Sequence, residues 1–242
     1  MRALALALVI PGLLAVMAYS GLTVAFRQDL IAFGTVFGQL PWLVPALGIG
    51  AVLALLSTVL MGIKRAVFPA FVSLLVALAA GAMFAGPASM KRTASQVPAI
   101  HDITTDRADP PVFVAVLPLR ADAPNPPEYD AKQGPLQAEG YPGLAPLIVE
   151  RPYAEVFPLA VEAARAEGLR LVAADPAAGR IEGVATTRWF GFKDDVVIRL
   201  RDAHDIATVV DIRSKSRMGR SDVGANAARI ERLLGSIEDA AG

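Results

Sequence analysis

The residues best suited to chemistry in this sequence are basic and spaced two apart. Arg213, Lys215 and Arg217 follow this spacing, and so do Arg199 and Arg201. Because side chains of a β-strand alternate between its faces, each set is expected on one face, and a hairpin would place the two sets together. Guanidinium groups and the free N–H groups of a helix N-terminus suit phosphate or carboxylate. The sequence therefore predicts an anion-binding face made of Arg199, Arg201, Arg213, Lys215, Arg217 and Arg220.

The same face has a second interpretation as a solvated or structural surface. Six acidic residues between Asp194 and Asp222 nearly balance eight basic residues between Arg188 and Arg220. Asp211 lies in the same alternating row as the basic residues and would neutralise part of their charge. Exposed ion pairs are common and individually weak, so the sequence leaves both interpretations open.

A different chemistry is suggested by His101, Asp102 and Asp106. These residue types bind metals, and a membrane-bound hydrolase or metal-dependent enzyme is the alternative function. A metal site needs three or four converging ligands, and this spacing supplies only a partial set. Hydrogen bonds to the local backbone in a turn are the simpler role for Asp102, so we predict no metal and no cofactor.

Nucleophilic catalysis has little support in the sequence. The chain has two histidines, no cysteine and no Gly-x-Ser-x-Gly motif. Asp194 and Asp195 are neighbours on a predicted strand, so their carboxylates should point to opposite faces and not form an acid–base pair. We therefore predict no catalytic residues.

The elements that must position the basic face follow residue 150. Apolar spacing predicts a helix over 153–167, ended by Gly168, and a last helix over 222–239, capped by Ser221 or Asp222. Strands are predicted at 169–173, 180–187, 195–201 and 206–215. The order of helix, four strands and helix predicts an α+β fold over 151–242, with an antiparallel meander and two packing helices.

A proline-rich segment precedes this domain. Residues 98–158 hold 12 of the 18 prolines, which disfavour regular helices and sheet ladders. We predict an extended arm over 91–150. The arm should pack on the domain, because it carries apolar residues that a solvated linker would lack: Phe113, Val114, Val116 and Leu117.

Residues 1–90 have the composition of a membrane anchor. Of 46 charged residues, 41 lie after Met90, and uncharged runs cover Ala3–Phe26, Leu30–Ile63 and Ala66–Met90. About 20 apolar residues cross a bilayer, so we predict three transmembrane helices at 3–25, 41–62 and 66–86. The middle run is too long for one span. Leu30–Leu40 should lie at the interface or pack on the bundle, with Pro41 and Trp42 beginning the second helix.

Charge gives the expected partners and orientation. Residues 1–90 carry a net +3 and the remainder a net −3, which argues against nucleic-acid binding and leaves membrane lipids as the partner of the anchor. The basic residues that flank the spans are nearly equal in number on the two sides of the membrane. The N-terminal amino group and the partial neutralisation of Arg27 by Asp29 favour a cytoplasmic N-terminus. Three spans then place the C-terminal domain outside the cytoplasm.

One aromatic motif also has two interpretations. Trp189-Phe190-Gly191-Phe192 places three aromatic residues within four positions. Buried, the motif would be part of the core, where clustered aromatic side chains are common. Exposed, it would form a patch for a partner or a membrane surface.

Three longer stretches resemble a known bacterial family, the domain of unknown function 1499. They are Pro98–Asp106 continued by Pro110–Phe113, Thr186–Val197 and Asp211–Asp222. The resemblance covers about residues 97–238. It implies a membrane-associated envelope protein and carries no established activity, so it transfers no functional residue. With the composition, it predicts a multi-pass protein of the bacterial inner membrane with a periplasmic domain. We expect that domain to bind an anionic ligand, a lipid headgroup or a protein partner without catalysis.

Overall fold

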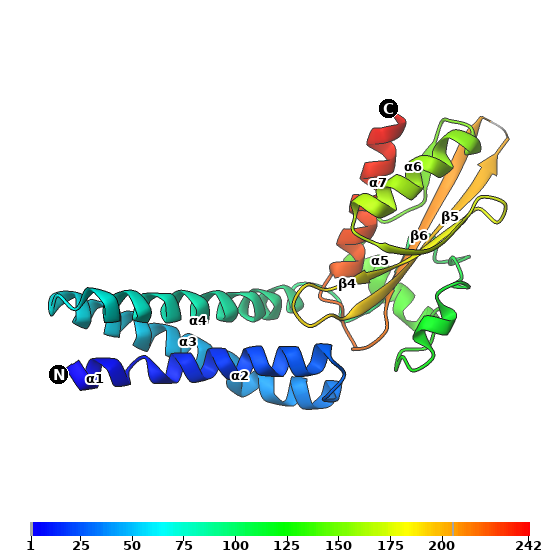
Figure 1. The fold of residues 1–242 in the computed structure, drawn as a ribbon. Helices are drawn as coiled ribbons and strands as arrows, with labels where there is room; N and C mark the ends of the chain where they lie inside the picture. Colours follow the sequence, from blue (N-terminus) through cyan, green and yellow to red (C-terminus); the bar gives the residue numbers. More distant parts are fainter. Residues whose placement is uncertain (1, 205) are drawn as a thin grey trace. The chain divides into compact units, whose positions relative to one another are not determined.

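The computed structural model describes residues 2–204 and 206–242. The chain forms two compact units, Met1–Arg92 and Thr93–Gly242 (Figure 1). The first is helical, and the second combines a six-stranded sheet with helices, which confirms the α+β prediction. The proline-rich arm is part of the second unit.

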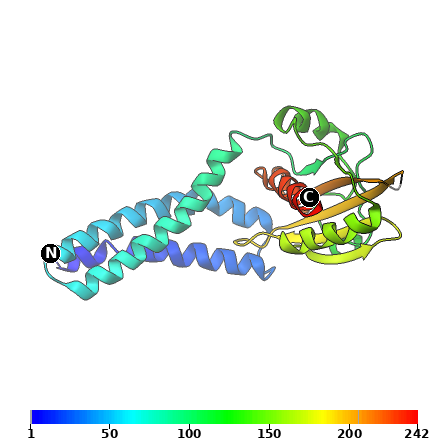
Figure 2. The same cartoon turned by 90° about the horizontal axis from the view of Figure 1, so that it is seen from above.

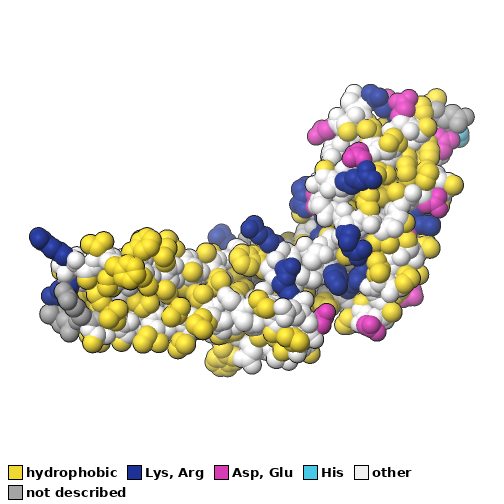
Figure 3. Space-filling model, in the orientation of Figure 1, with side chains coloured by type: hydrophobic (Ala, Val, Ile, Leu, Met, Phe, Trp, Pro, Cys, Tyr) yellow, Lys and Arg dark blue, Asp and Glu magenta, His cyan; other side chains and the backbone are white. Residues whose placement is uncertain are grey.

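The helical unit contains three helices long and apolar enough to cross a membrane, as predicted. Figures 1 and 2 both show them side by side. Figure 3 shows that the surface of this unit is mostly hydrophobic, whereas charged side chains of both signs are scattered over the second unit. The helices are α1 (Arg2–Ala7) and α2 (Ile10–Arg27), which together form the first span, then α3 (Phe33–Ile63) and α4 (Val67–Ala94).

The helices that contain the second and third spans are longer than predicted. Helix α3 begins at Phe33 and not at Pro41, so most of Leu30–Leu40 belongs to this helix, and Pro41 and Pro45 lie inside it. Helix α4 continues past Pro87 to Ala94. Proline interrupts the hydrogen bonding of a helix locally, but neighbouring helices make this tolerable in a membrane bundle.

Small residues allow the helices of this unit to approach one another closely. A Cβ atom added at Gly50 would lie 2.5 Å from Cα of Gly12, so only glycine fits at this crossing of α2 and α3. Nearby, the buried Ser57 hydroxyl donates to the carbonyl of Ala5 at 2.6 Å and lies 3.0 Å from the Ser73 hydroxyl. These contacts join α1, α3 and α4.

The second unit contains the predicted meander and two additional strands. Helix α6 (Tyr153–Ala166) ends at Gly168, whose φ of +82° favours glycine. Helix α7 (Ala225–Ala241) begins after Asp222, whose carboxylate accepts the N–H groups of Gly224 and Asn226. The strands are β1 (Asp102–Thr104), β2 (Leu147–Val149), β3 (Arg170–Asp175), β4 (Arg180–Thr186), β5 (Lys193–Ala203) and β6 (Ala207–Ser216).

All pairings in the sheet are antiparallel, in the order β1-β6-β5-β4-β3, with β2 also pairing β6. Strands β1 and β2 come from the arm, where three-residue strands between prolines leave no periodic pattern to predict. The outer side of β1 is closed by amide side chains. Gln137, on helix α5 (Gly134–Gly140), accepts the N–H of Thr104 and donates to its carbonyl, and Gln133 accepts the N–H of His101.

The two faces of the sheet have different coverings (Figure 1). Helices α6 and α7 cover one face and form the main core with it; its fully buried side chains include Ile198, Ile212 and Ile230. The arm covers the other face, where Phe113 and Val116 pack on Val184 and Val197. On this side lie the 3₁₀ turns η1 (Leu117–Arg120) and η2 (Ala131–Gln133).

We predict that residues 97–242 fold without the anchor, because this segment includes the sheet, both helices and the arm. A fragment of residues 151–242 should fail to fold cooperatively, since it lacks β1, β2 and the cover of one sheet face. Urea unfolding followed by circular dichroism compares the two fragments. Cooperative unfolding of the shorter fragment, or its absence in the longer one, would contradict the prediction.

Candidate functional site

The face of the sheet beneath the arm carries an unusual number of charged side chains, and we call it the polar face. It forms because alternate residues of adjacent strands point the same way. The pairing register places Lys215 beside Asp102 and Asp195, and Arg213 beside Thr104 and Val197. The charged residues of the polar face are Asp102, Arg180, Glu182, Asp195, Arg199, Arg201, Asp211, Arg213, Lys215 and Arg217.

At one edge of the polar face, the Asp102 carboxylate binds two cations. Its Oδ1 accepts from Nε of Arg213, and its Oδ2 accepts from Nη2 of the same residue, both at 2.8 Å. The Lys215 ammonium donates to Oδ2 at 2.9 Å. All three residues are at most 1% exposed. A bidentate pair of this kind is short, strong and directional, so it locks β1 onto β6.

The arm completes the surroundings of these two cations. Arg213 donates to the carbonyls of Pro111 and Pro127 at 3.2 and 3.0 Å, and Lys215 donates to the carbonyl of Glu128. The rings of Phe113 and Tyr129 lie 4.8 and 5.5 Å from the Arg213 guanidinium carbon, within range of a cation–π interaction. Burial lowers the pKa of Lys215, and the attraction of Asp102 opposes this shift.

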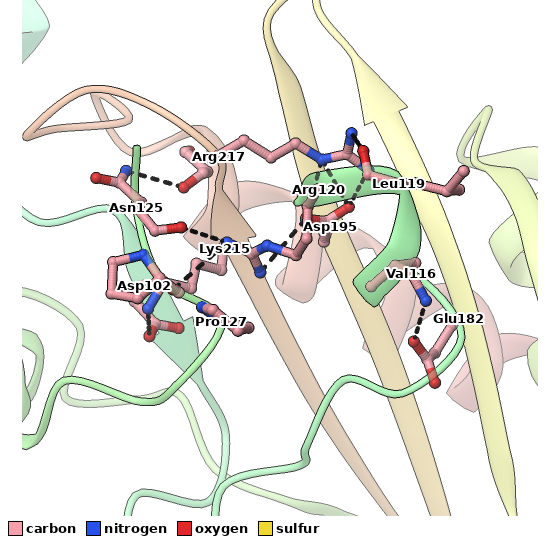
Figure 4. A network of polar contacts seen from close by, with 12 residues as sticks. Asp102, Val116, Leu119, Arg120, Asn125, Pro127, Glu182, Asp195, Lys215 and Arg217 are labelled. Atoms are coloured by element: carbon pink, nitrogen blue, oxygen red, sulfur yellow. Dashed lines mark hydrogen bonds and ion pairs between the residues drawn. The ribbon is translucent and has the colours of Figure 1, made fainter. Parts of the chain in front are cut away.

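A second buried group is centred on Asp195. Arg217 donates to its Oδ1 at 2.7 Å, and Arg120 of η1 approaches its Oδ2 at 3.4 Å (Figure 4). Arg217 also donates to the carbonyl of Leu119, and Arg120 to that of Asn125. Among described residues, Nε and Nη1 of the buried Arg120 have no hydrogen-bond acceptor. Burial lowers the pKa of Arg120, while Asp195 opposes the shift.

The arm holds Glu182 through backbone N–H groups, whereas it holds the cations of the polar face through backbone carbonyl groups. Its carboxylate accepts the backbone N–H groups of Val114, Ala115 and Val116 at 3.0–3.1 Å. Arg180 adds an ion pair at 3.0 Å. The arm thus offers carbonyl groups to the cations of the polar face and N–H groups to this anion. Figure 4 shows both kinds of contact around Arg217 and Glu182.

Arg199 and Arg201 lie on the polar face nearer to solvent. Both bind the buried Asp211 carboxylate, at 3.0 and 2.8 Å, and both approach Asp106 at about 3.5 Å. Arg199 also pairs with Asp109 at 2.8 Å. Three carboxylates therefore surround these two guanidinium groups. Arg220, the last predicted member of the set, is exposed in the loop before α7.

The structure separates the residues of the alternative, enzymatic hypothesis. Asp102 binds Arg213 and Lys215, whereas Asp106 faces Arg199 and Arg201. His101 is half-buried, and its pKa is lowered by burial and then by the charge of Lys215. Within residues 2–204 and 206–242, no group of three or more His, Asp or Glu side chains is arranged to hold a metal ion.

The two adjacent aspartates point apart, as strand alternation predicts. Asp195 belongs to the polar face, whereas Asp194 lies on the helix-covered face and pairs with Arg229 at 2.8 Å. Arg229 also donates to Ser214 and Asn226, which completes a charge-balanced buried group beneath α7. The two carboxylates therefore do not form an acid–base pair.

Several residues of the site escaped the sequence analysis. Arg120 and Asn125 lie in the arm, where no periodic pattern marks them. The sequence does mark Glu182, because it is the one charged residue between Ile181 and Thr186 in an otherwise apolar strand. A charge at such a position indicates a buried partner, although the partner turned out to be arm backbone.

A family model described as "Protein of unknown function (DUF1499)" matches residues 102–237. The chain belongs to this family. The match begins at Asp102 and includes the arm from that residue on, the sheet and nearly all of α7. The DUF1499 domain of this chain therefore coincides with the unit that contains the polar face, and the resemblance expected from the sequence is confirmed.

Other comparisons add little. None of the curated proteins matches this chain. Among solved structures, the chain is similar to the di-domain ARO/CYC BexL from the BE-7585A biosynthetic pathway, with 16% identity and a TM-score of 0.31. That similarity covers 39% of this chain and 44% of the other. A similarity this weak carries no argument about fold or activity.

The geometry of Asp102 yields a stability prediction. Replacing Asp102 with Asn leaves Arg213 and Lys215 buried without their counter-ion, which should cost about 3–5 kcal/mol of unfolding free energy. The matched control is Asp109→Asn, because the Asp109 side chain is 71% exposed and should contribute less than about 1 kcal/mol. Urea unfolding of both variants measures the difference. Equal losses would show that the buried pair has no special role.

Proposed function

We propose that this protein is a membrane-anchored, non-catalytic module of the bacterial cell envelope whose DUF1499 domain binds an anionic ligand. The domain would lie on the periplasmic side of the inner membrane, and the helices of the first unit would contact membrane lipids. The apolar character of those helices supports the anchoring. The odd number of spans and the charges flanking them support the orientation.

The observation that carries the ligand proposal is a local excess of buried cations around two carboxylates. The other buried carboxylates of the polar face, Glu182 and Asp211, pair with arginines nearer to solvent. Arg120, Arg213, Lys215 and Arg217 are at most 7% exposed, and the carboxylates that bind them are Asp102 and Asp195. Four cations therefore face two anions. Burying uncompensated charge is costly, and the carbonyl dipoles of the arm compensate it only in part. A phosphate-type anion would neutralise the excess.

Arg120 is the residue best placed to receive such an anion. Its buried Nε and Nη1 have spare hydrogen-bonding capacity, whereas Arg213 is bound by a carboxylate and two carbonyls. Between η1 and η2 the arm has no helix or strand, so a local opening of residues 121–130 would admit a small anion. Arg199 and Arg201 are less suited to this role, because three carboxylates surround them.

Topology gives a direct test of the localisation. A fusion of alkaline phosphatase to the C-terminus should be active in a bacterial host, because this enzyme folds only outside the cytoplasm. A fusion of a fluorescent protein that matures only in the cytoplasm should remain dark. The reverse pattern would place the domain inside and contradict the orientation.

Anion binding is tested by thermal unfolding of the full-length protein at increasing inorganic phosphate and constant ionic strength. Binding to the folded state should add about 2.7 kcal/mol at 100 times the Kd, which raises Tm by several degrees. Arg120→Met should abolish this rise while leaving both buried carboxylates with a cation. Arg213→Ala and Arg217→Ala should also weaken binding, but each removes one of the two cations of a buried carboxylate and lowers Tm by itself.

Arg229→Met is the matched control for this experiment. It removes a buried arginine from the charge-balanced group on the other face of the sheet, so it should lower Tm without changing the phosphate-dependent rise. A rise of equal size in wild type and Arg120→Met, or none in wild type, would exclude the anion site. The arginines of the polar face would then have a structural role.

A further inference from the structure

The chain enters the DUF1499 domain at one particular end of the sheet. Strand β1 begins at Asp102, which lies opposite Lys215 near the end of β6. Lys215 in turn lies opposite Asp195 near the start of β5, and β4 ends where Thr186 pairs with Lys193. The β4–β5 loop, residues 187–192, is therefore at the same end of the sheet as the connection from α4.

That connection is short and is fixed to the domain. Helix α4 ends at Ala94, and the Val97 side chain already lies against Gly224, where an added Cβ would be 3.6 Å from Cγ1 of Val97. Ile100 is buried and accepts the N–H of Asp222 at 3.0 Å. Three residue steps span at most about 11 Å. Only this short stretch of chain separates the end of α4 from Val97.

The β4–β5 loop has the residues of a membrane-interface contact. Trp189 is 54% exposed, and the rings of Phe190 and Phe192 stack with centroids 5.6 Å apart. The loop is closed by Thr187, whose N–H donates to the carbonyl of Phe192 and whose hydroxyl accepts the N–H of Phe192. Gly191 provides the positive φ of +71° that the turn requires. Tryptophan and tyrosine concentrate at the headgroup level of membranes.

The charges around this loop favour an anionic surface. Three basic residues are exposed here: Arg188 in the loop after β4, Lys193 at the start of β5 and Arg220 in the loop after β6. Nearby, Asp194 binds Arg229, and Asp222 accepts the N–H groups of Gly224 and Asn226. Each basic residue near an anionic leaflet adds about 1 kcal/mol of attraction.

From these observations we infer that the β4–β5 loop is a second membrane contact. Trp189 lies in the headgroup layer of the bilayer that holds the anchor, and Arg188, Lys193 and Arg220 bind the phosphate groups of anionic lipids. The inference rests on the membrane anchor and not on the anion site beneath the arm.

Tryptophan fluorescence of the full-length protein in lipid vesicles tests this contact. The chain has two tryptophans, so Trp42→Phe leaves Trp189 as the reporter. In vesicles of phosphatidylcholine and phosphatidylglycerol, Trp189 should be protected from acrylamide and quenched several-fold when the phosphatidylcholine is brominated. Replacing Arg188, Lys193 and Arg220 together with Gln should reduce the quenching in anionic vesicles, while urea unfolding remains unchanged.

A matched control moves the reporter to the opposite end of the sheet. Ile206, in the β5–β6 turn, is 74% exposed and is separated from the β4–β5 loop by the length of β6, about 30 Å. In the Trp42→Phe, Trp189→Phe background, Ile206→Trp should show no quenching by brominated lipid. Equal quenching at both positions, or none at Trp189, would overturn the inference. Neither outcome bears on phosphate binding, which is measured separately by Tm.

Discussion

The pairing of Asp102 with Arg213 and Lys215 is the interaction on which the rest of the DUF1499 domain depends. It joins the first residue of β1 to the long strand β6 where both are fully buried. A carboxylate in this position cannot be removed without leaving two buried cations unpaired. It also determines what the arm must provide, because the cations have more hydrogen-bond donors than one carboxylate can accept. The carbonyl groups of Pro111, Pro127 and Glu128 accept three more hydrogen bonds from these cations.

The prolines of the arm explain why its carbonyl groups are available to the buried cations. A regular helix or strand uses its carbonyl groups in its own hydrogen bonds, whereas an extended proline-rich segment leaves them available. The segment 111–127 uses its backbone in both directions, with carbonyls toward Arg213 and Arg217 and N–H groups toward Glu182. A charged sheet face covered by irregular backbone is less common than an apolar sheet face. Its directional hydrogen bonds fix the arm in one position on the sheet.

The sequence allowed the meander, both large helices and the membrane spans to be predicted, because their apolar spacing is regular over many residues. Alternation also placed Arg213, Lys215 and Arg217 correctly on one face. It could not show that this face is buried, since a solvated strand and a strand covered by polar backbone have the same pattern. Strands β1 and β2 and the role of Arg120 depend on contacts between residues 59 to 113 positions apart, and no local signal reports such contacts. In the anchor, Pro41 suggested a helix boundary that bundle packing overrides.

The amide groups of Gln133 and Gln137 have a consequence for how neighbouring copies of the domain behave. Tethered proteins share a two-dimensional surface, where their local concentration is high and open strand edges promote aggregation. Here the edge of β1 is occupied by side-chain amides that mimic another strand, and β2 is three residues long. At the far side, β3 has an irregular register between Leu171 and Ala173 and charged residues at both ends. The sheet therefore offers no long, regular edge to a second copy, and crowding in the membrane plane does not turn neighbours into a continuous β-structure.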